Sequence, residues 1–445
     1  MKNRSLANTI LSIVIMTVLA ALYGLSFYLS PPKYWESAVL ATAIYGLFAV
    51  SLIVFVPHLT SLLAGVEQPH LIRTGDRTYR RCGTREIGKL ILLIMGFRLI
   101  QVLVTYLIHY LHFGYGSTFF EVQRVWLDFY RPETMFPLYG YVSRVFWIFT
   151  FNYNHARFIG SFVFTACAGA ALYALVLFDF NRQTARRAVR FLFFLPMSCL
   201  LLGTVPDGLF LLLSVLALLW MRKRRFVLAN VFAMLAVTAH ALGFLLFFPI
   251  LAEYVAYLVG NSRVAREAEK WYLVKQILRS VSFVLIPIGV LLVMLYSLWT
   301  VFDPFACYRE VFGNITTTMP GTLFRFFDTA IDSTAMVTAQ TAPNLLASVL
   351  PPVLYLIGAC VLILLGCGKI DTSYVLMMVV SVTLMLMKGR ADDIAQLLTV
   401  VAPFPIAIAA LVKKRWLNYL LLILFGAGWI LYFYAFIIGI VGNAV

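Results

Sequence analysis

The sequence predicts an all-α, polytopic membrane protein. Of its 445 residues, 62% are hydrophobic and only 12% are charged, whereas soluble domains carry about 25% charged residues. Several apolar runs reach the roughly 20 residues needed to cross a bilayer. Each crossing must satisfy its own backbone hydrogen bonds, which favours helices. The short alternating segments typical of outer-membrane barrels do not occur.

The basic residues define the predicted topology. The formal net charge is +16, but most Lys and Arg residues lie in short loops between apolar runs. This is the positive-inside pattern of membrane proteins, so no nucleic-acid partner is predicted. Counting alternate basic loops gives about 11–13 crossings.

The six cysteines lack the spacing of a metal site. We therefore predict no metal ligands. The sequence indicates no cofactor, and a divalent cation is left open.

The first predicted unit, residues 1–89, holds two transmembrane helices at about 7–30 and 38–64 and a basic cytoplasmic loop. Residues 7–30 could be a signal peptide, but no clear small-residue cleavage site precedes Pro31, so we predict an uncleaved helix. Six cations between Arg73 and Lys89 mark the loop as cytoplasmic.

The second unit, residues 90–445, begins with a crossing at about 90–112. An extracytoplasmic loop follows, about 113–144, which contains Glu121, Asp128 and Arg131. Acids are scarce in this chain, so we expect the loop to supply part of any chemistry. The aromatic stretch 138–153 is expected to lie flat at the membrane interface, and about 156–178 then crosses inward.

Two apolar stretches, 191–220 and 226–260, are flanked by cations at both ends. Each must enter and leave on the cytoplasmic side, and each is too short for two full spans. We predict broken helices with turns near Thr204–Gly208 and Thr238–Gly243, because Pro206 and the glycines interrupt helices.

Asp207 and His240 should lie at similar depths near these turns. An ionisable residue inside a membrane is a functional candidate by default. The alternatives are that Asp207 caps the following helix and that His240 makes a hydrogen bond across helices.

A crossing at about 280–300 leads to a second outer loop, about 301–345, which includes Asp303 and Arg309. Further crossings are predicted at about 345–366, 372–387, 394–412 and 416–440. Between them, Lys388 and Arg390 face outward, against the charge rule. Either Asp392 and Asp393 neutralise them, or the pair binds an anion.

An outer site of this kind suits a lipid-linked phosphate substrate. No glycine-rich nucleotide loop is present, and nucleotide donors are absent outside the cell. Arginine binds phosphate oxygens bidentately, and a carboxylate can act as general base on an acceptor hydroxyl.

Five stretches carry a family resemblance. They are Thr134-Met-Phe-Pro-Leu-Tyr-Gly140, Arg186–Ser198, Thr204-Val-Pro-Asp-Gly-Leu-Phe210, Thr238-Ala-His-Ala-Leu-Gly243 and Phe302-Asp-Pro-Phe-Ala306. In this order they resemble the family of the second GPI mannosyltransferase and its bacterial relatives, polytopic glycosyltransferases of the GT-C class. The resemblance implies a polyprenyl-phosphate sugar donor, usually mannose, and a glycan or lipid-linked acceptor. The sequence departs from the family near Tyr115-Gly116, where a Trp-Asp pair is expected.

The resemblance and the predicted topology together nominate the site residues. The expected catalytic residues are Asp128, Glu121 and Asp207. The expected substrate-binding residues are Arg390, His240, Arg131, Asp303 and Arg309. The active site should be extracytoplasmic in a multi-pass cell-membrane protein, with the bacterial cytoplasmic membrane preferred and the endoplasmic reticulum expected for a eukaryotic source.

Two alternative functions stay open. The protein could bind a lipid or glycan without catalysis, or it could transport or flip a lipid-linked substrate. The missing Trp-Asp pair favours the first, and carboxylates and cations lining a path open to both faces would favour the second.

Overall fold

The computed structural model describes residues 2–64, 84–113, 136–202, 206–260, 270–312, 321, 323–328, 350–388 and 394–437. Within these ranges the chain is helical and contains no strand. Seven helices are long and apolar enough to cross a membrane, and three shorter apolar helices accompany them. The chain is therefore a multi-pass, all-α membrane protein, as predicted. The full number of crossings stays a prediction, because part of the chain lies outside the described ranges.

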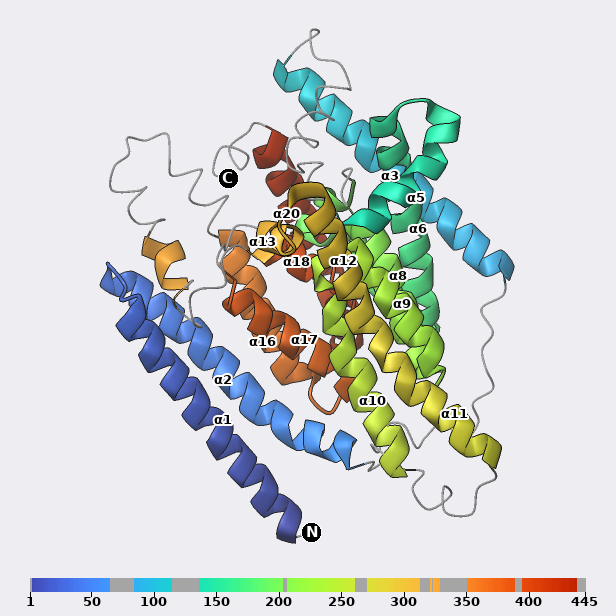
Figure 1. Ribbon diagram of the computed structural model, residues 1–445. Helices are drawn as coiled ribbons and strands as arrows, with labels where there is room; N and C mark the ends of the chain where they lie inside the picture. Colours follow the sequence, from blue (N-terminus) through green and yellow to red (C-terminus); the bar gives the residue numbers. More distant parts are fainter. Residues whose placement is uncertain are drawn as a thin grey trace.

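The first two helices form an antiparallel pair at the side of the bundle (Figure 1). They are α1 (Lys2–Leu29) and α2 (Trp35–Leu63). The Tyr45 hydroxyl donates to the Leu19 carbonyl, and the Tyr23 and Thr42 hydroxyls lie 2.6 Å apart. The inner face of α2 packs on α16, α10 and α17. Thus α2 belongs to the bundle, whereas most of α1 faces outward.

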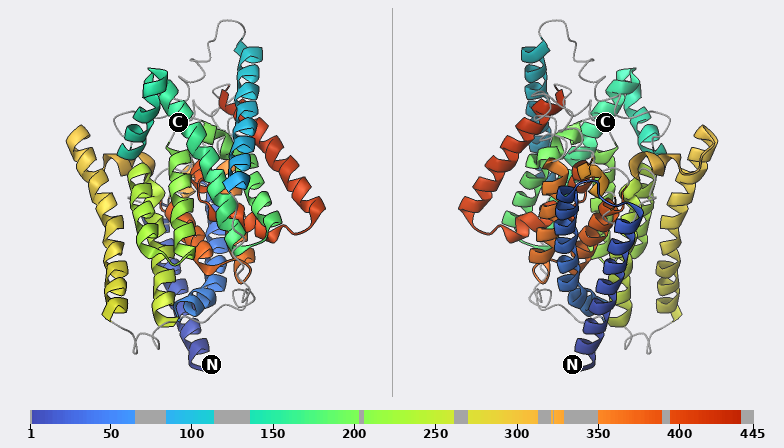
Figure 2. Two further views of the ribbon diagram at one scale, coloured as in Figure 1. Left: turned by 90° about the vertical axis from the view of Figure 1, so that its right-hand side faces the viewer. Right: turned by 90° about the vertical axis from the view of Figure 1, so that its left-hand side faces the viewer.

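The remaining helices build the bundle itself. They are α3 (Thr84–Phe113), α5 (Pro137–Thr150), α6 (Tyr153–Asp179), α7 (Arg182–Phe194), α8 (Asp207–Arg222), α9 (Phe226–Ala239), α10 (Phe247–Gly260), α11 (Lys270–Val281), α12 (Leu285–Val301), α13 (Ala306–Phe312), α16 (Leu350–Gly366), α17 (Thr372–Leu386), α18 (Ile394–Thr399), α19 (Pro403–Leu411) and α20 (Arg415–Ile437). Helix α8 packs between α6 and α9, and α12 covers α9. In Figure 2, α12 and α20 lie on opposite flanks.

The two predicted broken hairpins are present, with one difference. The chain turns through η4 (Pro196–Leu202) before α8 begins at Asp207. Helix α9 ends at Ala239, His240 is extended, and η5 (Ala241–Leu246) leads into α10. In the first hairpin the rising limb is a short 3-10 helix and not an α-helix, since α7 ends at Phe194. The four arginines of α7 give that helix a polar face unsuited to a bilayer core.

Two other segments differ from the sequence-based expectation. The predicted crossing at 394–412 is two short helices, α18 and α19, separated at residues 400–402. Two prolines at the start of α19 account for the break, because proline lacks the N–H needed inside a helix. The predicted outer loop 301–345 contains helix α13 in its described part.

Helix α5 has the aromatic surface expected of an interfacial segment. Phe149 and Phe151 are each 79% exposed and Trp147 is 47% exposed. Phe151 ends the helix in the left-handed conformation. Exposed aromatic rings at a helix end suit the membrane–water boundary.

Candidate functional site

Helix α8 carries a charged residue at each end. Asp207 is its first residue and Arg222 its last, over 16 residues. At 1.5 Å per residue the two lie about 22 Å apart. Both are buried, at 1% and 7% exposure. The bundle therefore holds two separate polar clusters, one near each end of the same helix.

The first cluster joins Asp207 to His240 and Gln396. The Nε2 atom of His240 lies 3.4 Å from Oδ1 of Asp207, and Nε2 of Gln396 donates to Oδ2 at 2.9 Å. No described residue forms a hydrogen bond to Oδ1 of Asp207. A buried carboxylate oxygen without a hydrogen bond is uncommon and requires an explanation.

The backbone fixes the tautomer of the neutral His240 ring. Its Nδ1 atom accepts a hydrogen bond from the Leu242 N–H at 3.0 Å, so the ring proton of the neutral imidazole resides on Nε2, the atom that lies 3.4 Å from Asp207. Phe210 stacks on the ring at 4.9 Å and Phe136 at 6.2 Å between centroids. The imidazole is thus held in one orientation, with Nε2 on the side of the Asp207 carboxylate.

Cations and a tyrosine complete this cluster. Lys388 is 1% exposed and its charge acts on His240. Tyr139 lies within electrostatic range of Asp207, donates to the Arg157 carbonyl at 2.8 Å and packs under the Arg157 guanidinium. Arg157 is 3% exposed. The Asp207–His240 pair is thus bordered by buried Lys388 on the His240 side and by Tyr139, which packs on buried Arg157.

Two glycines make the close packing at this cluster attainable. A Cβ atom on Gly208 would lie 2.4 Å from the Thr165 hydroxyl oxygen, and one on Gly243 would lie 2.3 Å from the Val237 backbone nitrogen. Gly208 lets α8 approach α6, and Gly243 lets η5 fold back on α9. Asp207 and His240 are positioned at breaks in the helices, and these breaks require residues without a Cβ atom at Gly208 and Gly243.

The segment after α12 packs against the same cluster. Tyr308 of α13 meets Phe136 edge-on at 5.6 Å, and Phe136 stacks on His240. Next to Tyr308, Arg309 pairs with Asp303 at 3.2 Å. Asp303 also accepts from the Phe305 N–H at 3.0 Å. Asp303 and Arg309 thus form an ion pair with each other on a partly exposed surface.

The structure places the predicted site residues in three groups. Asp207 and His240, chosen from separate hairpins, are in contact. Asp303 and Arg309 form their own pair nearby. The other four lie outside the described residues: Glu121, Asp128, Arg131 and Arg390.

One of the two alternatives for the buried pair is wrong, because Asp207 does not cap α8. Asp207 is the first residue of α8 and makes no N-cap hydrogen bond, since Pro206 occupies the cap position. The Nδ1 atom of His240 accepts a hydrogen bond from Leu242 in its own hairpin, while Nε2 lies 3.4 Å from Asp207 of α8, so a hydrogen bond of His240 across helices stays a prediction. The partner contributed by Gln396 was not predicted, because nothing in the sequence pairs an uncharged glutamine with a residue 189 positions away.

The second cluster surrounds Arg222 with three acids. Its guanidinium lies 3.0 Å from Asp179, 2.7 Å from Glu253 and 2.6 Å from Asp371. All four side chains are 8% exposed or less. Sequence analysis assigned Arg222 only to topology and overlooked the acids. The available signal was that each acid stands at or near the end of an apolar run, beside predicted cytoplasmic cations.

Every acid of this second cluster has a further partner. The Tyr374 hydroxyl donates to Asp179 at 2.5 Å, and the Ser373 hydroxyl donates to Glu253 at 2.9 Å. The Ser373 N–H donates to Asp371 at 2.9 Å. The network is therefore saturated, unlike the cluster around Asp207.

Neither cluster has the composition of a metal centre. Across the part of the chain that the structure describes, no group of three or more His, Cys, Asp or Glu side chains could hold a metal ion.

Comparison of the chain with protein-family models, with curated proteins and with solved structures finds no match.

Proposed function

We propose that the protein is a membrane glycosyltransferase that moves a sugar from a polyprenyl-phosphate donor to an extracytoplasmic or lipid-linked acceptor. The sequence resemblance nominates mannose as the sugar. One observation carries the proposal: where two helices are interrupted, a buried carboxylate with one oxygen not hydrogen-bonded by any described residue lies 3.4 Å from a fixed imidazole. Buried Lys388 and Arg157 stand near His240 and Tyr139 respectively. Intramembrane ionisable groups in such a setting mark functional sites.

The proposed roles follow from the chemistry of the groups. The acceptor oxygen bonds to the anomeric carbon of the sugar, the bond from that carbon to the donor phosphate breaks, and polyprenyl phosphate leaves with the electron pair. The acceptor proton passes to a carboxylate. Asp207 is the described acid that has an oxygen available, while Gln396 and His240 orient it. Asp128 and Glu121 stay candidates for the same role.

Arg157 and Lys388 suit the donor phosphate. A guanidinium or ammonium group near a leaving phosphate stabilises the charge that develops on it. Arg390, two residues after Lys388, belongs to the same proposed role. Phe136, Phe210 and Tyr308 supply apolar walls around the imidazole.

The test is transfer of radiolabelled mannose from polyprenyl-phosphate mannose by the purified protein in liposomes. Asp207→Asn should lower the rate by about 10²–10⁴-fold, the range of a general acid–base contribution. Glu36→Gln, a change at an exposed acid of α2, should leave the rate within about twofold. A comparable loss of rate in the Asp128→Asn/Glu121→Gln double variant would assign the base to one of these two acids, and an unchanged rate would exclude both. Absence of transfer with this donor and every sugar tried would remove the proposal.

A transporter or flippase is the second candidate. Interrupted helices and charged clusters at both ends of α8 favour it, because transporters bind substrates at breaks in membrane helices. Movement of a fluorescent polyprenyl-phosphate sugar between leaflets, without change in the sugar linkage, would support this candidate over transfer. Donor binding with neither transfer nor movement would favour the non-catalytic alternative.

A further inference from the structure

A cavity of about 570 Å³ opens beside the Arg222 network, at the opposite end of α8 from Asp207. It lies between the start of α7, the junction of α16 and α17, and the end of α19. Four of its lining residues are basic: Arg187, Arg222, Lys369 and Lys413. Two are acidic, Asp179 and Asp371. Its volume is within the range of small-molecule sites, about 300–1,000 Å³.

The two acids of the cavity both pair with Arg222. Its Nε donates to both Asp179 oxygens at 3.0 and 3.2 Å, and its Nη1 lies 2.6 Å from Asp371. Their other hydrogen bonds come from Tyr374 and Ser373. With four basic and two acidic side chains, the lining keeps a formal net charge of +2.

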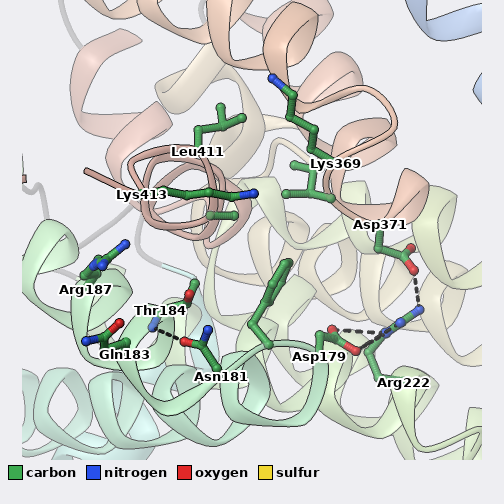
Figure 3. A pocket seen from close by; sticks show the side chains of 13 residues that line it. Asp179, Asn181, Gln183, Thr184, Arg187, Arg222, Lys369, Asp371, Leu411 and Lys413 are labelled. Atoms are coloured by element: carbon green, nitrogen blue, oxygen red, sulfur yellow. Dashed lines mark hydrogen bonds and ion pairs between the residues drawn. The ribbon is translucent and has the colours of Figure 1, made fainter. Parts of the chain in front are cut away.

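Those three cations approach the cavity from different elements (Figure 3). Arg187 comes from α7, Lys369 precedes α17 and Lys413 follows α19. Arg187 donates to the Val412 carbonyl at 2.5 Å, which anchors one edge of its guanidinium. Within the described residues, Arg187, Lys369 and Lys413 make no ion pair. Asn181 and Thr184 add neutral polar groups to the same wall.

We propose that this cavity binds a phosphate-bearing anion. Three cations that converge on one space repel each other, and an anion between them would relieve that repulsion. Arginine and lysine together are the usual ligands of phosphate, one as a planar fork and the other as a point charge. A topological role for the basic residues requires only that they lie on one side of the membrane, and does not require a shared cavity.

Phosphate of two origins fits this chemistry. Basic pockets between membrane helices on the cytoplasmic side bind lipid headgroups, and a soluble phosphate would meet the same groups. The proposal does not depend on glycosyl transfer, because the cavity lies about 22 Å along α8 from Asp207. It is therefore tested by binding and not by turnover.

The first arm titrates inorganic phosphate into the purified protein in phosphatidylcholine nanodiscs, followed by calorimetry. The second uses native mass spectrometry after exchange into nanodiscs of nine parts phosphatidylcholine and one part phosphatidic acid. The Lys369→Gln/Lys413→Gln double variant should bind about 25-fold more weakly, since each cation near a membrane surface contributes about fivefold. Both lysines are exposed, so their replacement should leave the fold intact.

The matched control is Lys414→Gln/Arg415→Gln, which removes two adjacent exposed cations that do not line the cavity. It should change affinity by less than about twofold. If inorganic phosphate binds and Lys369→Gln/Lys413→Gln weakens that binding, the ligand is a soluble phosphate. If only phosphatidic acid binds, and the same double variant weakens it, the ligand is a lipid headgroup. Equal loss in the two double variants, or no binding of either probe, would overturn the proposal.

Discussion

The two ends of α8 use buried charge in opposite ways. At its last residue, Arg222 meets three acids, and each acid has at least one more hydrogen bond. At its first residue, Asp207 keeps one oxygen without a hydrogen bond from any described residue. Buried polar groups in folded proteins are nearly always satisfied. The acids around Arg222 thus have all their partners within the protein, so the anion proposed for the adjacent cavity would rely on Arg187, Lys369 and Lys413. Asp207, in contrast, keeps an oxygen of its own for a ligand.

The backbone also differs between the two ends of α8. Arg222 ends a regular helix, whereas Asp207 and His240 stand where helices stop. Functional sites commonly keep such irregular backbone, because it exposes groups that a continuous helix would cover. Three substitutions test whether this contrast is real.

The largest effect is expected from Arg222→Leu. This change leaves Asp179, Glu253 and Asp371 buried together without their cation, and removal of one partner of a buried ion pair costs about 3–5 kcal/mol. The free energy of unfolding, measured by chemical denaturation in detergent, should fall by at least that amount.

Arg224→Gln provides the control for this variant. Arg224 also pairs with Glu253, at 3.0 Å, but its side chain is 47% exposed. Its removal should cost under about 1 kcal/mol. Equal losses in the two variants would contradict the importance given to the buried network.

A smaller loss is expected from Gly243→Ala. The new Cβ would lie 2.3 Å from the Val237 backbone nitrogen. The backbone shift needed to avoid this clash should lower the free energy of unfolding by about 1–3 kcal/mol. The thermal midpoint in detergent should fall, and His240 should shift with η5. Gly46→Ala, where nothing lies within 4 Å, should leave the midpoint unchanged or slightly higher.

The smallest effect, of opposite sign, is expected from Asp207→Asn. The carboxylate is buried, so its replacement by a neutral amide relieves a desolvation cost. The new amide oxygen can face the His240 Nε2–H, and the Gln396 amide can turn over to accept from the new N–H. Stability should rise by up to about 1 kcal/mol while the proposed transfer is lost, a trade-off typical of active sites. A loss above about 2 kcal/mol would mean that the His240 contact stabilises the fold, and would weaken the contrast between the two ends.

Several features were predicted from the sequence because they depend on local properties. Apolar runs located most helices to within a few residues, since lipid selects for hydrophobic length. Pro206 and the turn around Gly243 predicted the helix interruptions, and the equal depth of Asp207 and His240 followed from hairpin symmetry. The exceptions were the rising limb of the first hairpin, which is the 3-10 helix η4, and the predicted crossing at 394–412, which is divided into α18 and α19.

The sequence by itself determined that the chain is a helical membrane protein, that its helices break near Pro206 and Gly243, and that Asp207 and His240 stand at these breaks. Only the tertiary structure decided that Gln396 meets Asp207, that three acids surround Arg222 and that Arg187, Lys369 and Lys413 share a cavity. Hydrophobicity reports that a segment is in the membrane, but apolar helix faces resemble one another and do not specify a neighbour. Which charges meet is decided by the packing of the whole bundle.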